Sequence, residues 1–302
     1  QQVPGKFELS QSVNKFFRLA DGRVMFNPIG QCSATLEVET QHFLADSQRA
    51  NTSCCLLSEA LGSLSISQII YTPLAVSSAV FHPDINESTL NIVIDIGAGM
   101  TSIAVPTPVG YFHLEQIPIG CDHIANDLSI ALDLPIQTTR ALLCQMREIH
   151  CSAIATKDGN AREVSVHQYT QGKHRLIPAS SIETIIELRL TELFDTIKRR
   201  LNDNNAYVWL GNTITLSGGG ARIPQITDLA KSIFNRQVIV GQAYKITGKN
   251  NFEAMPQHNT IIGLLRSGRR FLQINQEVAE QASLLTSGLN WWKNVCKAIL
   301  DW

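Results

Sequence analysis

The sequence lacks the features that would place the protein at once in a broad class. No apolar run approaches the ~20 residues that a transmembrane helix needs. Neither sign of charge is in excess, because 25 basic side chains stand against 26 acidic ones. This balance gives no global reason to expect binding to nucleic acid or to an acidic surface. Any partner must therefore be recognised locally.

The seven cysteines lack the C-x-x-C spacing that zinc and redox sites use. Their number is odd and they are scattered, so we expect free, mostly buried thiols in a reducing cytoplasm. The 302 residues are 44% hydrophobic and 17% charged, which is enough for a substantial core in about two domains.

Hydrophobic periodicity predicts alternating strands and helices along the chain. The first part is predicted to hold a strand at 34–43, a helix at 49–64, a short strand at 67–72 and a helix at 73–81. A strand at 111–117 follows, and then a helix with Ile124, Leu128 and Ala131 on its inward face. The helix after Pro135 leads to a predicted hairpin at 162–178.

The strongest helix pattern runs from Ser181 to Leu201, with an apolar stripe of Ile182, Ile185, Ile186, Leu190, Leu193, Ile197 and Leu201. A strand at 214–216 and a helix opened by Pro224 come next, the latter facing inward through Ile226, Leu229, Ala230 and Ile233. A strand at 236–242 precedes a last helix at 258–268, with Gly268 as its C-cap.

The stretch "IVIDIGAGMTSIAV", residues 92–105, predicts a strand, a turn and a second strand. Gly97 and Gly99 permit a positive φ, and Asp95 ends the first strand. No helix and no G-K-[ST] follows, which excludes Rossmann and Walker A loops. Two interpretations stay open: a plain hairpin, or a phosphate-binding turn whose carboxylate holds magnesium through water.

A second turn, "SGGGAR" at 217–222, lies between a predicted buried strand and a helix. Its glycines serve either close packing or the approach of a ring or phosphate to the backbone. Both turns in this order are more specific evidence for a phosphate- or ring-binding site than either turn alone.

In this order the turns resemble the actin, Hsp70 and sugar-kinase superfamily, and within it the FtsA family of bacterial cell-division proteins. The resemblance covers nearly the whole chain, through "NPIGQCSATLEVETQHF", "IPIGCDHIANDLSIALDLP", "SIETIIELRLTELFDTI", "QVIVGQ" and "TIIGLLRSG". It implies an α/β, actin-like (ribonuclease-H-like) nucleotide-binding fold that is N-terminally incomplete, plus the small inserted domain of FtsA.

The resemblance also implies a division into domains. Residues 1–85 would form part of the inserted domain and a connecting helix, and 86–272 the second actin-like lobe, with an outer subdomain at about 135–205 and a terminal helix. A linker at 273–287 would then lead to an amphipathic helix at 288–302.

ATP and magnesium are the implied cofactors, with at most weak ATPase activity and no catalytic residue assigned. The implied contacts to phosphate and magnesium are Asp95, Gly97, Gly99 and Thr101, with Asp95 holding magnesium through water and Gly120 near the cleft. Gly218, Gly219 and Gly220 would border adenosine, and Glu187 and Arg189 would reach the nucleotide or a subunit interface.

The segment "GLNWWKNVCKAILDW", residues 288–302, has an apolar face and three tryptophans. It is interpreted as a helix lying in the headgroup region of a membrane, with docking on the protein's own core as the alternative. FtsA proteins end in such a helix. The expected membrane contacts are Leu289, Trp291, Trp292, Val295, Ile299 and Trp302.

The resemblance implies a scaffold on the cytoplasmic face of the membrane at the division site. It would anchor FtsZ filaments through the FtsZ C-terminal peptide, associate into filaments and help to recruit other divisome proteins, without binding nucleic acid. Lys198, Arg199 and Arg200 are the candidate contacts to acidic groups of that peptide, on a surface shared with the hairpin. At the C-terminal turn of a helix, the three cations also complement the helix dipole. The alternatives are a small-molecule kinase, for which only Asp95 offers a base, and a pilus-assembly actin homologue.

We predict weak or absent ATP binding by this polypeptide alone. Ala98 and Met100 replace a glycine and a threonine of the family's turn, and Met100 removes a hydroxyl that would bond a phosphate. No aspartate–glycine hairpin of the family's first phosphate loop precedes Asp95 in this sequence. Titration with labelled ATP and magnesium tests the prediction, and micromolar affinity would contradict it.

Overall fold

The structure is a computed structural model that describes residues 7–62, 66, 68–81, 90–152, 154–155, 162–167, 174–203, 210–244 and 255–273. The predicted linker and the predicted membrane helix at 288–302 lie outside these residues. Within the part that is described, no helix is both long enough and apolar enough to cross a bilayer.

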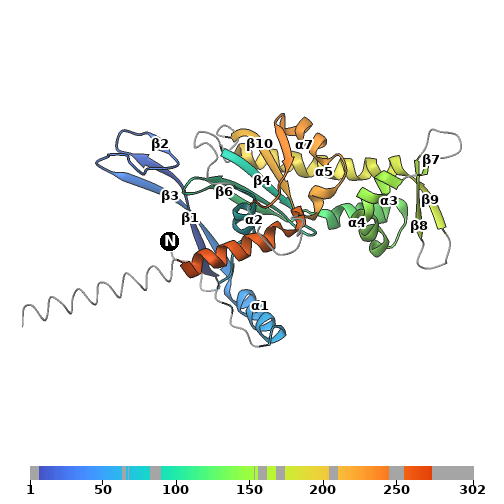
Figure 1. Cartoon of the computed structure of the whole chain (residues 1–302), viewed down its shortest axis with the longest axis horizontal. Helices are drawn as coiled ribbons and strands as arrows, with labels where there is room; N and C mark the ends of the chain where they lie inside the picture. The colour runs from blue at the N-terminus through green and yellow to red at the C-terminus, as the bar shows by residue number, and fades with distance from the viewer. Residues whose placement is uncertain are drawn as a thin grey trace, which may run out of the picture.

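A five-stranded mixed sheet forms the centre of the molecule (Figure 1), in the order β11-β10-β4-β5-β6. Its strands are β4 (Leu90–Ile96), β5 (Thr101–Thr107), β6 (Gly110–Ile117), β10 (Leu210–Ser217) and β11 (Gln237–Val240). β4, β5 and β6 form antiparallel hairpins, whereas β10 pairs in parallel with β4 and β11.

Alternate side chains of β4 point to opposite sides of the sheet, and helices cover both sides. Both faces of the sheet are therefore buried. Ile92, Ile94 and Ile96 pack in one core with α3 (Cys121–Leu132), α5 (Ala179–Asp203) and α7 (Ile226–Phe234). Val93 lies on the other face and packs with Val76 of α2 (Thr72–Val80).

The predicted helical faces are largely confirmed, with Ala131 as the exception. The stripe of α5 is buried at all its predicted positions except Ile185, which is half-buried. In α3, Ile124 and Leu128 are buried, but Ala131 is exposed, and Ala125 and Leu132 complete the inward face instead.

The first part of the chain departs most from expectation. An unpredicted strand, β1 (Phe7–Leu19), pairs with β3 (Leu36–Asp46) and with the short β2 (Val24–Met25), and it also packs against β6. The predicted short strand is wrong, since 68–71 has no regular structure and Thr72 already begins α2. α1 (Ser47–Ala60) buries no residue, because it projects away from the sheet (Figure 1).

A second small sheet stands at the far end of the molecule (Figure 1). Its hairpin of β8 (Arg162–His167) and β9 (His174–Pro178) confirms the predicted one, and β7 (Ile154–Ala155) adds a third strand. The sheet packs on α5 and on α4 (Ile136–Ser152).

The last described helix runs over 259–273 and continues through Gly268, so the predicted C-cap is wrong. Gly268 keeps a negative φ, and the helix is anchored on α2 instead of ending there. Gly263 lies so close to α2 that a Cβ would collide with the Ala75 carbonyl, and Arg266 donates to the Ala79 carbonyl at 2.7 Å.

The described cysteines are free, as expected, but the expectation that most are buried is wrong. Cys32, Cys55 and Cys144 are exposed, and Cys54 and Cys121 are half-buried. They lie on helices and loops outside the central sheet.

Candidate functional site

The parallel pairing of β4 with β10 brings the two glycine turns to the same edge of the sheet. In this register Asp95 lies opposite Ser217, so both strands end together. The second turn then packs directly on the first strand: a Cβ on Gly218 would collide with the Ile96 carbonyl, and one on Gly220 would lie 2.5 Å from Ile96 Cγ2. The two motifs, which lie about two fifths of the chain apart in the sequence, thus meet at one edge of the sheet.

The first turn, residues 97–100, is held by the N-terminus of α3. The carbonyls of Gly97 and Ala98 accept hydrogen bonds from the Cys121 and Asp122 amides at 2.9 and 2.8 Å. Gly120 must approach closely for this, because a Cβ there would collide with the Ala98 carbonyl. With its carbonyls fixed on α3, the turn exposes its tip from Ala98 to Met100.

Neither Gly97 nor Gly99 adopts the positive φ that glycine permits. Gly97 instead serves a tight contact, where an added Cβ would lie 3.0 Å from the Met100 carbonyl oxygen. In the second turn Gly218 does have a positive φ, of 83°. Gly97 is therefore needed for space, whereas Gly218 is needed for its conformation as well.

Asp95 is 7% exposed, and its Oδ1 atom has no hydrogen-bond partner. Burial raises the pKa of this carboxyl, and a hydrogen bond with Ser217 partly offsets the rise. A buried carboxylate oxygen without a partner is costly, so the site fits a cation or a cation-bound water there. Among the described residues there is no cluster of three metal-ligating side chains, which leaves binding through water as the fitting mode.

Thr101 and Cys121 lie next to the first turn, and neither is an exposed, reactive group. The Thr101 side chain is buried, and its hydroxyl donates to the Ile119 carbonyl at 2.7 Å, which ties β5 to the segment before α3. Burial raises the pKa of the Cys121 thiol to about 11, so this cysteine is not an activated nucleophile.

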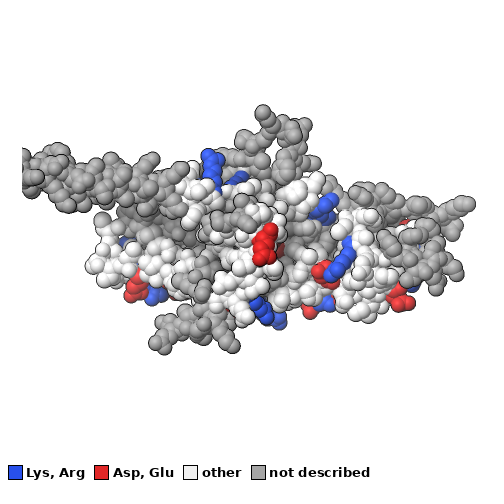
Figure 2. All heavy atoms as spheres, turned by 90° about the horizontal axis from the view of Figure 1, so that it is seen from below, with Lys and Arg blue, Asp and Glu red and all other residues white. Residues whose placement is uncertain are grey.

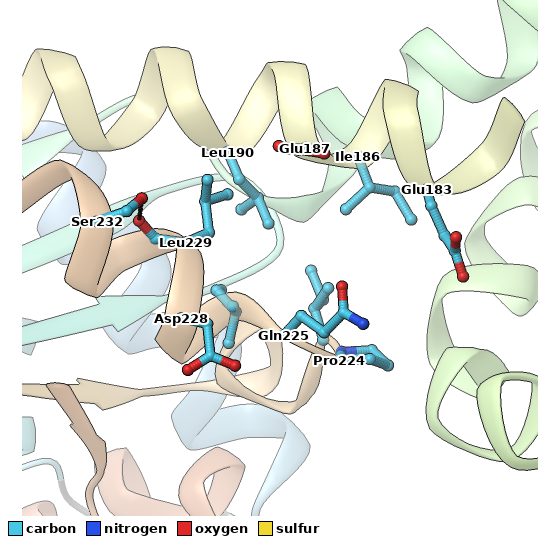
Figure 3. A pocket seen from close by; sticks show the side chains of 11 residues that line it. Glu183, Ile186, Glu187, Leu190, Pro224, Gln225, Asp228, Leu229 and Ser232 are labelled. Carbon is cyan, nitrogen blue, oxygen red and sulfur yellow. Dashed lines mark hydrogen bonds between the residues drawn. The ribbon is translucent and has the colours of Figure 1, made fainter. Parts of the chain in front are cut away.

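A cavity of about 370 Å³ opens behind the second turn, between α5 and α7 (Figure 3). Its walls combine apolar side chains with three carboxylates and one carboxamide: Glu183, Ile186, Glu187, Leu190, Ile223, Pro224, Gln225, Ile226, Asp228, Leu229 and Ser232. Glu187 is one of the residues that line this cavity. Glu183 lies one turn before it, and that spacing was the signal that the sequence reasoning missed.

Arg189 lies elsewhere and does not line this cavity. Its guanidinium makes a bidentate pair with Asp127 at 2.5 and 2.8 Å and also contacts Glu192 at 2.7 Å. The hydrogen bonds with Asp127 raise the pKa of Arg189 further. In the structure this residue joins α5 to α3.

The three cations at 198–200 do not form one patch, because successive helical residues point about 100° apart. Lys198 donates to the Ile233 carbonyl at 2.6 Å, and Arg200 pairs with Glu115. Arg199 lines an open groove on α5 together with Glu192 and Asp195. At 1.5 Å per residue the cluster lies roughly 30 Å along α5 from the β8–β9 hairpin, so the expected shared surface is not formed.

Figure 2 shows one further face of the molecule, on which basic and acidic side chains are few and interspersed. No large area of one sign is visible there, in keeping with the balanced composition.

A model of the family "Cell division protein FtsA" matches residues 92–263. Cell division protein FtsA of Escherichia coli K12 is 27% identical over 240 residues, which cover 77% of this chain and 56% of that protein. The protein of the same name from Neisseria meningitidis serogroup B is 28% identical, with 80% and 56% covered. The chain thus spans just over half the length of these curated relatives.

Among solved structures, the PilM–PilN type IV pilus biogenesis complex matches with a TM-score of 0.62 at 14% identity, covering 88% of this chain and 68% of that one. MreB 5 of Spiroplasma citri bound to AMPPNP matches with a TM-score of 0.51 at 15% identity, covering 76% and 67%. At such identities these likenesses show an actin-like fold and nothing more.

The glycines of the second turn predict two different mutant phenotypes. Gly220→Ala should cost about 1–3 kcal/mol of unfolding free energy, because its Cβ would overlap Ile96. Gly219→Ala should change stability by less than about 0.5 kcal/mol, since no atom lies within 4 Å of the added Cβ and φ is not positive. Urea denaturation measures both. Equal losses in the two variants would contradict this account of the turn.

Proposed function

Since the chain belongs to the FtsA family of cell-division proteins, we propose that it is an actin-like scaffold that anchors FtsZ filaments to the cytoplasmic membrane. The family match over residues 92–263 carries the proposal, because it spans both glycine turns and the cavity between α5 and α7. Self-association into filaments, recruitment of other divisome proteins and a place on the cytoplasmic face at the division site belong to the same proposal.

The site at the end of β4 and β10 is proposed to hold ATP with magnesium, with the weak affinity predicted for this polypeptide alone. Asp95 would hold the ion through water, which suits its unpartnered Oδ1 atom. The exposed tip of the first turn, including Gly99, would approach the phosphates. Magnesium would supply charge neutralisation for those phosphates.

Gly218 to Gly220 would border the adenosine, and the cavity behind them would take the base. Gly219 supports this assignment: the fold itself gives no reason for a glycine there, so the reason is sought in a ligand. Gly97 and Gly120 would act as positioning residues that keep the first turn on α3. Thr101 would do the same through its hydrogen bond to Ile119.

Glu187 is proposed to accept hydrogen bonds from ribose hydroxyls, since it lines the cavity beside the glycine turn. Arg189 is assigned to the contact between α5 and α3 instead of to the nucleotide.

The membrane attachment is proposed for residues 288–302 on their sequence pattern. With only two lysines against Asp301 in this segment, binding would depend on apolar area more than on charge. For the FtsZ peptide, Arg199 is the remaining candidate of the three cations, because Lys198 and Arg200 have intramolecular partners.

A pilus-assembly role is the second candidate, and the fold match to the PilM–PilN complex is what favours it. The FtsA family match weighs against it, since it rests on sequence and not on fold alone. The two roles differ in the peptide that is bound.

Co-sedimentation with phosphatidylglycerol–phosphatidylethanolamine vesicles and a labelled FtsZ C-terminal peptide tests the proposal. We expect the full chain to carry the peptide into the pellet. A chain ending at Ser287 should leave it in the supernatant while still binding it, because only the apolar segment is removed. Arg199→Glu should weaken peptide binding about 5-fold, and Arg269→Glu, an exposed arginine on another helix, serves as the matched control.

Pelleting of the shortened chain to the same extent would refute the membrane assignment. Equal peptide affinity in both arginine variants would refute the role of Arg199. Binding of a pilus-system peptide in place of the FtsZ peptide would favour the second candidate.

A further inference from the structure

Gln225 has a backbone conformation that its own residue type disfavours. It precedes α7 with φ 61° and ψ 4°, in the left-handed region where a side chain with a Cβ is strained. Glycine would adopt this conformation without strain. The local backbone therefore gives no reason for glutamine.

Capping of α7 gives no reason for glutamine either. Gln225 is the N-cap residue, a position that favours Ser, Thr, Asp or Asn, and its side chain makes no capping hydrogen bond. Its backbone carbonyl accepts from the Asp228 and Leu229 amides at 3.1 Å, which any residue would do. The presence of glutamine at this position must therefore be explained by the direction of its side chain.

The carboxamide of Gln225 points into the cavity between α5 and α7, below Ile186 (Figure 3). Gln225 is an exposed residue, and its side chain makes no capping hydrogen bond to α7. The other side-chain donor on the cavity wall, the Ser232 hydroxyl, already donates to the Leu229 carbonyl at 2.7 Å. The remaining polar groups of the wall are carboxylates, which accept only.

A ligand atom that accepts hydrogen bonds would therefore find its side-chain donor at Gln225. A carboxamide pairs in bidentate fashion with a ring nitrogen acceptor beside an amino donor, as on adenine. The acceptor Glu187 suits the second N–H of such an amino group or a ribose hydroxyl.

We infer that Gln225 is a specificity-determining residue that reads the 6-amino edge of an adenine in this cavity. The inference rests on the proposed nucleotide site and adds to it the residue that selects the base. Backbone strain at Gln225 persists because the side chain that it positions contacts the ligand.

A double-mutant cycle between protein and nucleotide tests the inference. Binding of Mg·ATP and of the Mg complex of purine riboside triphosphate, which lacks the 6-amino group, is measured by ligand-observed NMR on the full chain. Gln225→Gly should lower ATP affinity about 5- to 10-fold and change affinity for the deaminated nucleotide less than about 2-fold. The same variant should raise the melting temperature by roughly 2–4 °C, because the strain is relieved.

Asn235→Gly is the matched control. Asn235 ends α7 with φ 52°, so its replacement relieves a similar conformation at the opposite end of the same helix, away from the cavity wall. It should leave the affinities for both nucleotides unchanged.

Equal losses for the two nucleotides in Gln225→Gly would show a merely structural role and overturn the inference. Unchanged affinity for both would overturn it as well, while leaving the proposed site intact. If the unmodified chain binds neither nucleotide at millimolar concentration, the proposed nucleotide site itself fails, and the inference falls with it.

Discussion

The parallel pairing of β4 with β10 is the constraint on which the rest of the site depends. It sets Asp95 opposite Ser217, so the turns that follow the two strands meet at one edge. Close contact at Gly218 and Gly220 then presses the second turn onto Ile96. A slip of this register would move Asp95 away from Ser217 and separate the two turns.

The surrounding helices support the two turns. Amides at the N-terminus of α3 donate to the carbonyls of the first turn, and the cavity behind the second turn lies between α5 and α7. Arg189 joins α5 to α3 through Asp127, so the wall that carries Glu187 is tied to the helix that supports the first turn. On the opposite face, α2 and the helix at 259–273 are locked together at Gly263.

Sequence reasoning found the features that depend on local pattern. The apolar run of β4 and the apolar stripe of α5 follow from residues close together in the chain, and each glycine turn is recognised from a few consecutive residues. It failed where tertiary contacts decide. Gly97 is needed for space instead of for φ, and Gly268 lies within a helix that is anchored on α2. β1 pairs with β2 and β3 and packs against β6, and these contacts are made only in the folded chain. Gln225 carries no sequence signal, because its role depends on a backbone conformation and a cavity that only the fold shows.

The central claim is that the two glycine turns and the cavity form a single nucleotide site. Backbone amide shifts in 1H–15N spectra, recorded while Mg·ATP is added to millimolar concentration, test it most directly. The account predicts concerted shifts at Ala98 to Met100, at Gly218 to Gly220 and at Gln225, with α1 unchanged. Shifts confined to one turn, or spread over α1 as much as over the site, would contradict it.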